Sequence, residues 1–196
     1  MFADHQPVIA AAGTRDAVSF ERVCAFVLAT IRCPFPSAVS ASKRYYASGE
    51  LERQAFFGAK LDGLAYAREN AASMLAECEY VARTSDEPEV ELVDIFERIP
   101  GIGLAKAGFL AQLLYGRVGC LDTHNLVRFG LRVKEFRSLT EVKRQATRKA
   151  KIRQYVDTCA QLGSAATLWD GWCAYVGKTQ GYGSAEQVSA MHLVVV

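Results

Sequence analysis

Apolar side chains recur along this chain at intervals of three and four residues, which is the spacing of one buried face of an α-helix. The pattern is strong over residues 17–31, 62–82, 104–115 and 165–176, and it is weaker over 37–46, 49–60, 89–98, 123–130 and 139–162. Nowhere does the alternation typical of a β-strand continue for more than a few residues. We therefore predict an all-α fold.

Proline, glycine and short polar side chains mark the expected ends of these helices. Pro34 and Pro36 end the first helix, and Ser37 is expected to cap the second. Residues 84–88 form a polar linker, and Gly163 ends the long basic helix. Residues 1–14 are expected to be a loose arm, and residues 177–196 an irregular tail or a short strand. Three aromatic side chains are predicted to lie in the core: Trp169, Trp172 and Tyr175.

The composition is that of a water-soluble globular protein. Of the 196 residues, 51% are hydrophobic and 22% are charged, which suits one domain or two closely packed lobes. No apolar run reaches the roughly 18 residues that span a bilayer, and no secretory signal pattern is present. We expect a cytoplasmic monomer without a membrane partner.

The six cysteines are scattered and form no C-x-x-C pair. Zinc and iron–sulfur sites require closer, repeated spacing, so we predict buried thiols and no metal bound through cysteine.

Positive charge is concentrated in one segment, although the net charge of the chain is only +2. Residues 128–153 contain ten lysines and arginines against Glu135 and Glu141, a local balance of +8. Such a segment suits phosphate contacts, which give salt-sensitive affinity without sequence preference. The alternative is an ordinary solvated helix face.

Residues 99–128 combine a tight turn with an acidic residue at the start of a later helix. The turn Pro100-Gly101-Ile102-Gly103 allows positive φ angles and a close approach of the backbone. The N–H groups at the helix start that follows can bind a phosphate oxygen, with or without a monovalent cation. Asp122 and Thr123 are good capping residues for the next helix.

These residues resemble the helix-hairpin-helix DNA glycosylase superfamily over residues 17–132. Residues 99–103, Ile-Pro-Gly-Ile-Gly, match its L-P-G-V-G hairpin, and residues 121–124, Leu-Asp-Thr-His, match its V-D-T-H turn. The resemblance implies a two-lobed helical bundle that flips the substrate base into the cleft between the lobes. Residues 1–196 would form one such unit. Its DNA-binding lobe comprises about residues 30–130 with the hairpin, and the N-terminal helices pack with residues 131–196 as the second lobe.

One departure from the superfamily bears directly on the chemistry. Its glycosylase-lyases carry a lysine where this chain has Ala105, and Lys106 follows one place later, about 100° round the helix. The C-terminal cysteine cluster of several relatives is also absent. Asp122 therefore stands without the covalent partner that a lyase uses.

A narrower resemblance covers residues 103–130, with Gly-Cys-Leu-Asp-Thr-His-Asn at 119–125. It is to the bacteriophage branch named for alpha-glutamyl/putrescinyl thymine pyrophosphorylase, or amino acid:DNA transferase. This branch implies hypermodification of thymine in double-stranded DNA, in which a free amino acid or amine displaces pyrophosphate from 5-pyrophosphoryloxymethyl uracil. The expected partners are this DNA and the amine, and the expected location is the host cytoplasm if a phage encodes the chain.

The expected catalytic residues are Asp122, Lys106, His124 and Asn125. Asp122 would take a proton from the incoming ammonium, and Lys106 and Arg128 would neutralise the departing pyrophosphate. A bound Mg²⁺ would assist, although no carboxylate cluster requires one. Each residue also has a structural alternative: Asp122 as a helix cap, His124 as a structural or phosphate-facing group, Asn125 as a backbone anchor and Lys106 as a surface cation.

The expected DNA contacts come from the hairpin and from basic or aromatic side chains around it. Phe35, between two prolines, would be a wedge that fills the gap left by a flipped base, or else a core residue. The full set is Pro100, Gly101, Ile102, Gly103, Arg128, Arg32, Phe35, Lys143 and Arg144.

Two other functions compete with base transfer. A monofunctional glycosylase would use Asp122 to activate water and to stabilise an oxocarbenium-like sugar. A non-enzymatic module would bind the DNA backbone alone, although it would have no need of an aspartate at that turn.

Overall fold

The computed structural model describes residues 16–132, 136, 139, 145–185 and 187–188, and this part of the chain contains helices and no strand. The all-α prediction is confirmed for these residues. None of the described helices is both long and apolar enough to cross a membrane. The helices are α2 (Ala17–Ala29), α3 (Phe35–Ser48), α4 (Ala59–Thr84), α5 (Pro88–Phe96), α6 (Leu104–Tyr115), α7 (Thr123–Arg128), α8 (Gln145–Leu162) and α9 (Ala165–Gln180).

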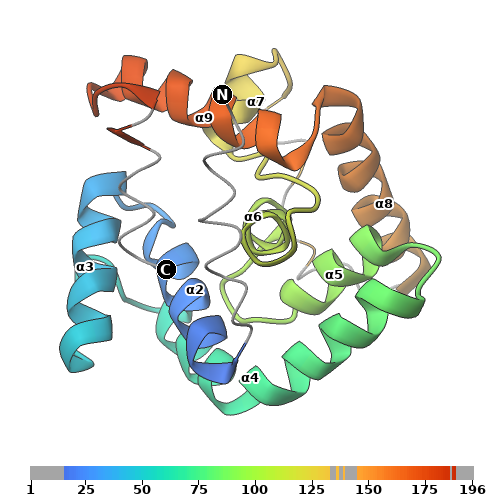
Figure 1. Ribbon diagram of the computed structural model, residues 1–196, viewed down its shortest axis with the longest axis horizontal. Helices are drawn as coiled ribbons and strands as arrows, with labels where there is room; N and C mark the ends of the chain where they lie inside the picture. The colour runs from blue at the N-terminus through green and yellow to red at the C-terminus, as the bar shows by residue number, and fades with distance from the viewer. Residues whose placement is uncertain (1–15, 133–135, 137–138, 140–144, 186, 189–196) are drawn as a thin grey trace.

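Helix α6 occupies the centre of the molecule. It is seen nearly end-on in the middle of Figure 1, and it packs against α2, α5 and α8. Apart from Lys106 and Gln112 its residues are apolar or tyrosine on all sides, and every position from Ala107 to Leu114 is buried. A helix without a polar face is stable only when other helices surround it. This explains why the sequence places its most uniformly hydrophobic helix here.

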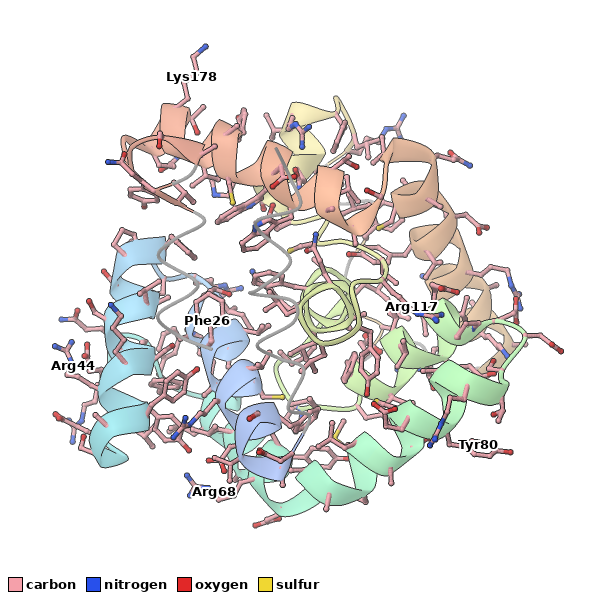
Figure 2. All side chains as sticks on the ribbon, in the orientation of Figure 1. Phe26, Arg44, Arg68, Tyr80, Arg117 and Lys178 are labelled. Carbon is pink, nitrogen blue, oxygen red and sulfur yellow. The ribbon has the colours of Figure 1, made fainter. Side chains whose placement is uncertain are left out.

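Helix α2 links the central helix to the outer ones. It packs on α3, α4 and α6, and its residues from Val23 to Ala29 are buried. Phe26, which lies inside the assembly in Figure 2, has its ring centroid 6.2 Å from that of Phe35 and 6.1 Å from that of Phe109. These contacts join α2, α3 and α6 through one aromatic cluster.

Several helix boundaries differ from the sequence prediction. Helix α3 begins at Phe35 rather than at Ser37, because proline is tolerated in a first turn whose N–H groups have no helical partner. The short helix expected within residues 49–60 is wrong, since residues 50–58 form turns and α4 begins at Ala59. Leu139 lies outside any helix.

The C-terminal helix is longer than predicted. Helix α9 continues past the expected end at Val176 to Gln180, and Gly181 caps it with a φ of 68°. Part of the predicted tail is thus helical. The expected arm over residues 1–14 and the last residues of the tail, 189–196, lie outside the described residues.

Basic side chains of helix α8 pair with acidic side chains of α5 and of the residues that immediately precede and follow α5. Arg148 Nε lies 2.8 Å from Asp94 Oδ1, and its Nη2 pairs with Glu97. Arg153 donates to both carboxylate oxygens of Glu87, at 2.7 and 2.6 Å. The helix pair α5–α8 is therefore held by charge as well as by packing, and these arginines are not free cations awaiting phosphate.

The turn between α5 and α6 rests on the first turns of α4. Gly101 has a φ of 81°, in the left-handed region that favours glycine, whereas Gly103 has an extended φ of −108° and caps α6. The prediction of positive φ thus holds for the first glycine and is wrong for the second. A Cβ on Gly63 would overlap the carbonyl oxygen of Pro100, so glycine is needed for this close approach of α4 to the turn.

Candidate functional site: two cavities that meet at Asp122

The segment that carries Asp122 is fastened to the core by a buried tyrosine. Tyr155, on α8, is fully buried; its hydroxyl donates to Gly119 O at 2.6 Å and accepts from Leu121 N at 3.1 Å. Burial raises the pKa of this phenol well above its usual value, which keeps it protonated and able to donate. On the other side, Gly108 of α6 leaves the room that the Gly119 carbonyl and the phenol fill. The backbone leading to Asp122 is therefore fixed.

Asp122 is both a helix cap and a member of a side-chain pair. Its Oδ1 accepts a hydrogen bond from Asn125 N at 3.0 Å, which caps α7 as predicted. Its Oδ2 accepts one from the indole Nε1–H of Trp172 on α9, also at 3.0 Å. A carboxylate has about four lone-pair positions, so two acceptor positions remain for another donor.

Aromatic side chains enclose a cavity of about 210 Å³ on one side of this carboxylate. The indoles of Trp169 and Trp172 are stacked at 5.9 Å and 18°, and Phe109 stacks on Trp169 at 5.8 Å. Phe35 meets Trp172 edge-on at 5.4 Å. We call this cavity the aromatic pocket; its aromatic walls are Phe35, Phe109, Trp169, Trp172 and Tyr182.

A second, more open cavity of about 440 Å³ lies beside the turn that precedes α6. We call it the turn groove; its lining includes Arg32, Gly101, Gly103, Lys106, Asp122 and His124. Five of its polar or ionisable residues also line the aromatic pocket: Thr30, Cys33, Lys106, Asp122 and His124. A carboxylate, a lysine and a histidine thus stand between an enclosed aromatic space and an open groove.

The predicted catalytic residues all line the aromatic pocket, but they differ in their contacts and in whether they also line the turn groove. Lys106 lines both cavities, with Nζ 5.3 Å from the Phe109 ring centroid, whereas Ala105 lines only the groove. His124 lines both and packs against Trp172 and Tyr175. Asn125 also lines the aromatic pocket, but its amide is occupied: Nδ2 donates to Cys120 O at 2.7 Å and Oδ1 accepts from Arg128. Asn125 is therefore a backbone anchor in this structure.

The predicted DNA-contacting residues are divided among several places. Arg32, with a φ of 52°, lines the turn groove together with Gly101 and Gly103. Ile102 is buried, and Pro100 is packed against α4. Phe35, only 7% exposed, forms a wall of the aromatic pocket instead of projecting as a wedge.

Three predicted contacts lie away from the two cavities or outside the described residues. Arg128 stacks on Phe129 at 4.4 Å and packs against Gly171 of α9, so it lines neither cavity. Lys143 and Arg144 lie outside the described residues.

Sequence reasoning missed the polar partners that come from distant helices. Trp172 was expected only in the core, yet its indole holds Asp122. Lys60 is 4% exposed, and its Nζ donates to Ala55 O at 2.7 Å. Burial lowers the pKa of Lys60, and the positive charges of Lys106 and Arg32 lower it further. The position of Lys60 on a core-facing side of a helix could have indicated a buried lysine from the sequence. Nothing in the sequence indicated the contact between Trp172 and Asp122.

Gln112 was also missed, although a polar residue in the apolar run of α6 is itself a signal. It is 2% exposed and lines the aromatic pocket.

No resident metal site is built into the described residues. They contain no group of three or more His, Cys, Asp or Glu side chains placed to hold an ion. In the turn, the carbonyl oxygens of Ile99 and Gly103 accept backbone hydrogen bonds. We therefore assign no chemical step to Mg²⁺ or to a monovalent cation.

Comparison of the chain with protein-family models, with curated proteins and with solved structures finds no match.

Proposed function

We propose that this protein is a DNA base-modifying transferase, in which an amino acid or another amine displaces pyrophosphate from 5-pyrophosphoryloxymethyl uracil in DNA. The observation that carries the proposal is the position of Asp122, Lys106 and His124 between the aromatic pocket and the turn groove. A planar base suits the stacked indoles, and a nucleic-acid backbone suits the open groove.

The size of the aromatic pocket favours a single ring. At about 210 Å³ it is smaller than the roughly 300–1,000 Å³ of sites that hold drug-sized ligands. Its enclosure means that a base from DNA would enter only by leaving the duplex stack. The 5-substituent of that base would then lie near the shared carboxylate.

Asp122 would act as the general base. It accepts one proton from the incoming ammonium, and the freed nitrogen lone pair attacks the exocyclic carbon of the base. A C–N bond forms as the C–O bond to pyrophosphate breaks, and the bonding electrons leave with the pyrophosphate. The two free acceptor positions of the carboxylate are what this role requires, because the cap and the Trp172 contact use the others.

Lys106 would stabilise the departing pyrophosphate. It lines both cavities, and Arg32 adds positive charge in the turn groove. Opposite charge near a leaving group lowers the energy of the transition state in which that charge develops. We assign this role to Lys106 and Arg32 and not to Arg128, which lines neither cavity.

A finer architecture belongs to the same proposal. We interpret α5, the turn over 97–103 and α6 as a helix-hairpin-helix element, and the helices around the aromatic pocket as two lobes. The N–H groups of Leu104 and Ala105 precede the first backbone bonds of α6, which Lys106 and Ala107 donate to Gly103 O. They are therefore suited to a phosphate oxygen in the turn groove.

Hydrolytic base removal is the second candidate, because the same carboxylate would equally activate water. The assay separates the two. The protein is incubated with duplex DNA carrying 5-pyrophosphoryloxymethyl uracil and a mixture of amino acids, the DNA is digested, and the nucleosides are weighed by mass spectrometry. Transfer predicts an aminoacyl-methyl nucleoside, a glycosylase predicts an abasic site, and a binding module predicts unchanged DNA.

Asp122→Asn is the decisive variant, with Asp157→Asn on the exposed face of α8 as its matched control. Asparagine keeps the helix cap but places an amide where Trp172 also donates, so the double variant with Trp172→Phe removes that clash. We expect both Asp122 variants to lose turnover and keep DNA affinity. Near-normal turnover in either would contradict the role of the carboxylate. Borohydride cross-linking of DNA to Lys106 would indicate lyase chemistry instead.

A further inference from the structure

Gln112 is a buried polar residue in the most apolar helix of the molecule. It lies on α6 between Ala111 and Leu113, is 2% exposed and lines the aromatic pocket. Its neighbours in α6 are leucine, alanine and phenylalanine, which contribute to the core without any polar requirement. A glutamine at such a position loses its hydration, so each polar atom of its amide needs a partner.

One end of this amide is fixed by the protein. Nε2 donates a hydrogen bond of 2.7 Å to the carbonyl oxygen of Ala165, the first residue of α9. Rotating the amide by half a turn would set Oε1 against that carbonyl, oxygen facing oxygen. The contact therefore fixes Nε2 toward Ala165 and leaves Oε1 as the end of the amide that can accept a hydrogen bond from another donor.

The other end has no partner within the described part of the chain. Among the described residues, the side-chain hydrogen bond of Gln112 is the one that Nε2 donates, and Oε1 is not one of the fully buried polar atoms without a partner. Oε1 therefore keeps some access to the aromatic pocket that Gln112 lines. The other pocket amide with a defined network, Asn125, has both ends occupied by Cys120 and Arg128. Gln112 Oε1 is thus an acceptor held in place without an internal donor.

We propose that Gln112 is a specificity-determining residue whose Oε1 accepts a hydrogen bond from the ring N–H of a uracil-type base held in the aromatic pocket. The inference rests on the proposed function in one respect, that the occupant is a DNA base. The stacked indoles recognise any planar ring. Gln112 adds selectivity for the base, because a base without an N–H on the inserted edge leaves Oε1 unpaired.

The test compares two duplexes that differ at that N–H, which a methyl group replaces in one of them; the Gln112 variants separate the lost hydrogen bond from the added bulk. One carries a thymine and the other a 3-methylthymine, each opposite an abasic-site analogue so that neither base is paired. A third duplex with abasic-site analogues on both strands measures binding without a base. Affinities are measured by fluorescence anisotropy of labelled DNA. Both tryptophans of the chain line the pocket, so quenching of their fluorescence reports that the base has entered it.

We expect the wild-type protein to bind the thymine duplex about tenfold or more tightly than the 3-methylthymine duplex, the ratio that one lost buried hydrogen bond produces. Gln112→Met, which has similar volume and no acceptor oxygen, should reduce the ratio to near one. Gln112→Glu keeps an acceptor and should retain discrimination. If a variant fails to fold, equal wild-type affinities for the two duplexes still overturn the proposal.

Equal wild-type affinities for the two duplexes would overturn the proposal, as would discrimination that persists in Gln112→Met. Tighter binding of a cytosine duplex than of the thymine duplex would overturn the uracil-type assignment. Failure of the transferase is distinguishable from these outcomes: N–H-dependent binding without a modified nucleoside would leave the Gln112 inference standing and remove the proposed reaction.

Discussion

The indole Nε1–H of Trp172 donates a hydrogen bond of 3.0 Å to Oδ2 of Asp122, across the space between α9 and the start of α7. The other carboxylate oxygen caps α7 through Asn125 N. The two contacts fix the orientation of the Asp122 carboxylate, and Asp122 lines both cavities. A residue 50 positions away in the sequence thus orients the group on which the proposed chemistry depends.

Trp172→Phe should lower turnover more than it lowers DNA affinity. The phenyl ring keeps an apolar surface against Trp169 and Phe35 but cannot donate to Asp122. A hydrogen bond to a charged group contributes about 1.5–3 kcal/mol, so we expect kcat to fall by roughly tenfold to a hundredfold with little change in KM for DNA. Trp169→Phe, which alters the neighbouring indole of the same stack, is the matched control. An equal effect of both variants on kcat would contradict a specific role for the Trp172 contact.

Tyr155→Phe should destabilise the fold through the segment before Asp122. The variant leaves Leu121 N–H and one bond to the Gly119 carbonyl unmade in a fully buried place. We expect the free energy of unfolding, measured by urea denaturation, to fall by about 1–3 kcal/mol. The control is Tyr80→Phe, because Tyr80 is 66% exposed and its replacement should change stability by less than about 0.5 kcal/mol. Wild-type stability in Tyr155→Phe would show that the phenol does not fasten this segment.

Gly108→Ala should lower stability more than Gly171→Ala, although both glycines are helical. At Gly108 a methyl group would overlap the backbone oxygen of Gly119 and the Tyr155 hydroxyl, neither of which can move freely. We expect a loss of about 1–3 kcal/mol in thermal or urea unfolding. At Gly171 the methyl meets the guanidinium of Arg128, which can move aside but then loses its hydrogen bond to Asn125 Oδ1. The better helix propensity of alanine offsets part of that loss, so we expect a change within about 1 kcal/mol. Equal losses at the two sites would refute this account.

The buried carboxylate of Glu97 should make stability depend on pH in a definite direction. Burial raises the pKa of Glu97 above 4.5, although Leu139 N–H and Arg148 oppose the shift. Between 4.5 and the raised pKa the folded protein holds more protons at this group than the unfolded chain does. The contribution of Glu97 to stability is therefore full below pH 4.5 and declines as the pH rises through that interval.

Urea denaturation of the wild-type protein and of Glu97→Gln across pH 4 to 7 measures this contribution. The difference in unfolding free energy, wild type minus variant, should become less favourable to the wild type as the pH rises. Glu69→Gln, at an exposed position of α4, controls for the loss of one acidic group. A difference that grows with pH would show that the ion pair with Arg148 outweighs burial.

Much of the helical framework is legible in the sequence because helices are built from local contacts. The end of α6 at Tyr115, the cap of α7 by Asp122 and the end of α8 before Gly163 depend on residues at most four or five positions apart. The errors also have local causes. Pro36 was read as a barrier although it suits a first helical turn, and residues 49–60 have apolar positions that are buried without forming a helix.

The side-chain contacts between distant helices could not be predicted from the sequence in the same way. The excess of basic residues over 128–153 suggested phosphate contacts, yet Arg148, Lys149 and Arg153 pair with acids of α5 and Glu87, which immediately precedes it. The sequence of neither segment indicates that the other is its partner. Attraction between opposite charges is not specific to sequence, so only the packing of α8 on α5 selects these pairs.

By itself the sequence determined that the chain is helical, that an aspartate caps a helix after a glycine turn, and that Lys106, Asp122 and His124 are the side chains to examine. Periodicity and capping act over a few residues, and one chain is enough to read them. The tertiary structure alone decided that Trp172 holds that aspartate, that Arg128 lies against α9 and lines neither cavity, and that Gln112 lines the aromatic pocket. These relations join residues tens of positions apart, and they exist only because α6 packs at the centre, where α8 packs on it and Gln112 and Phe109 reach α9.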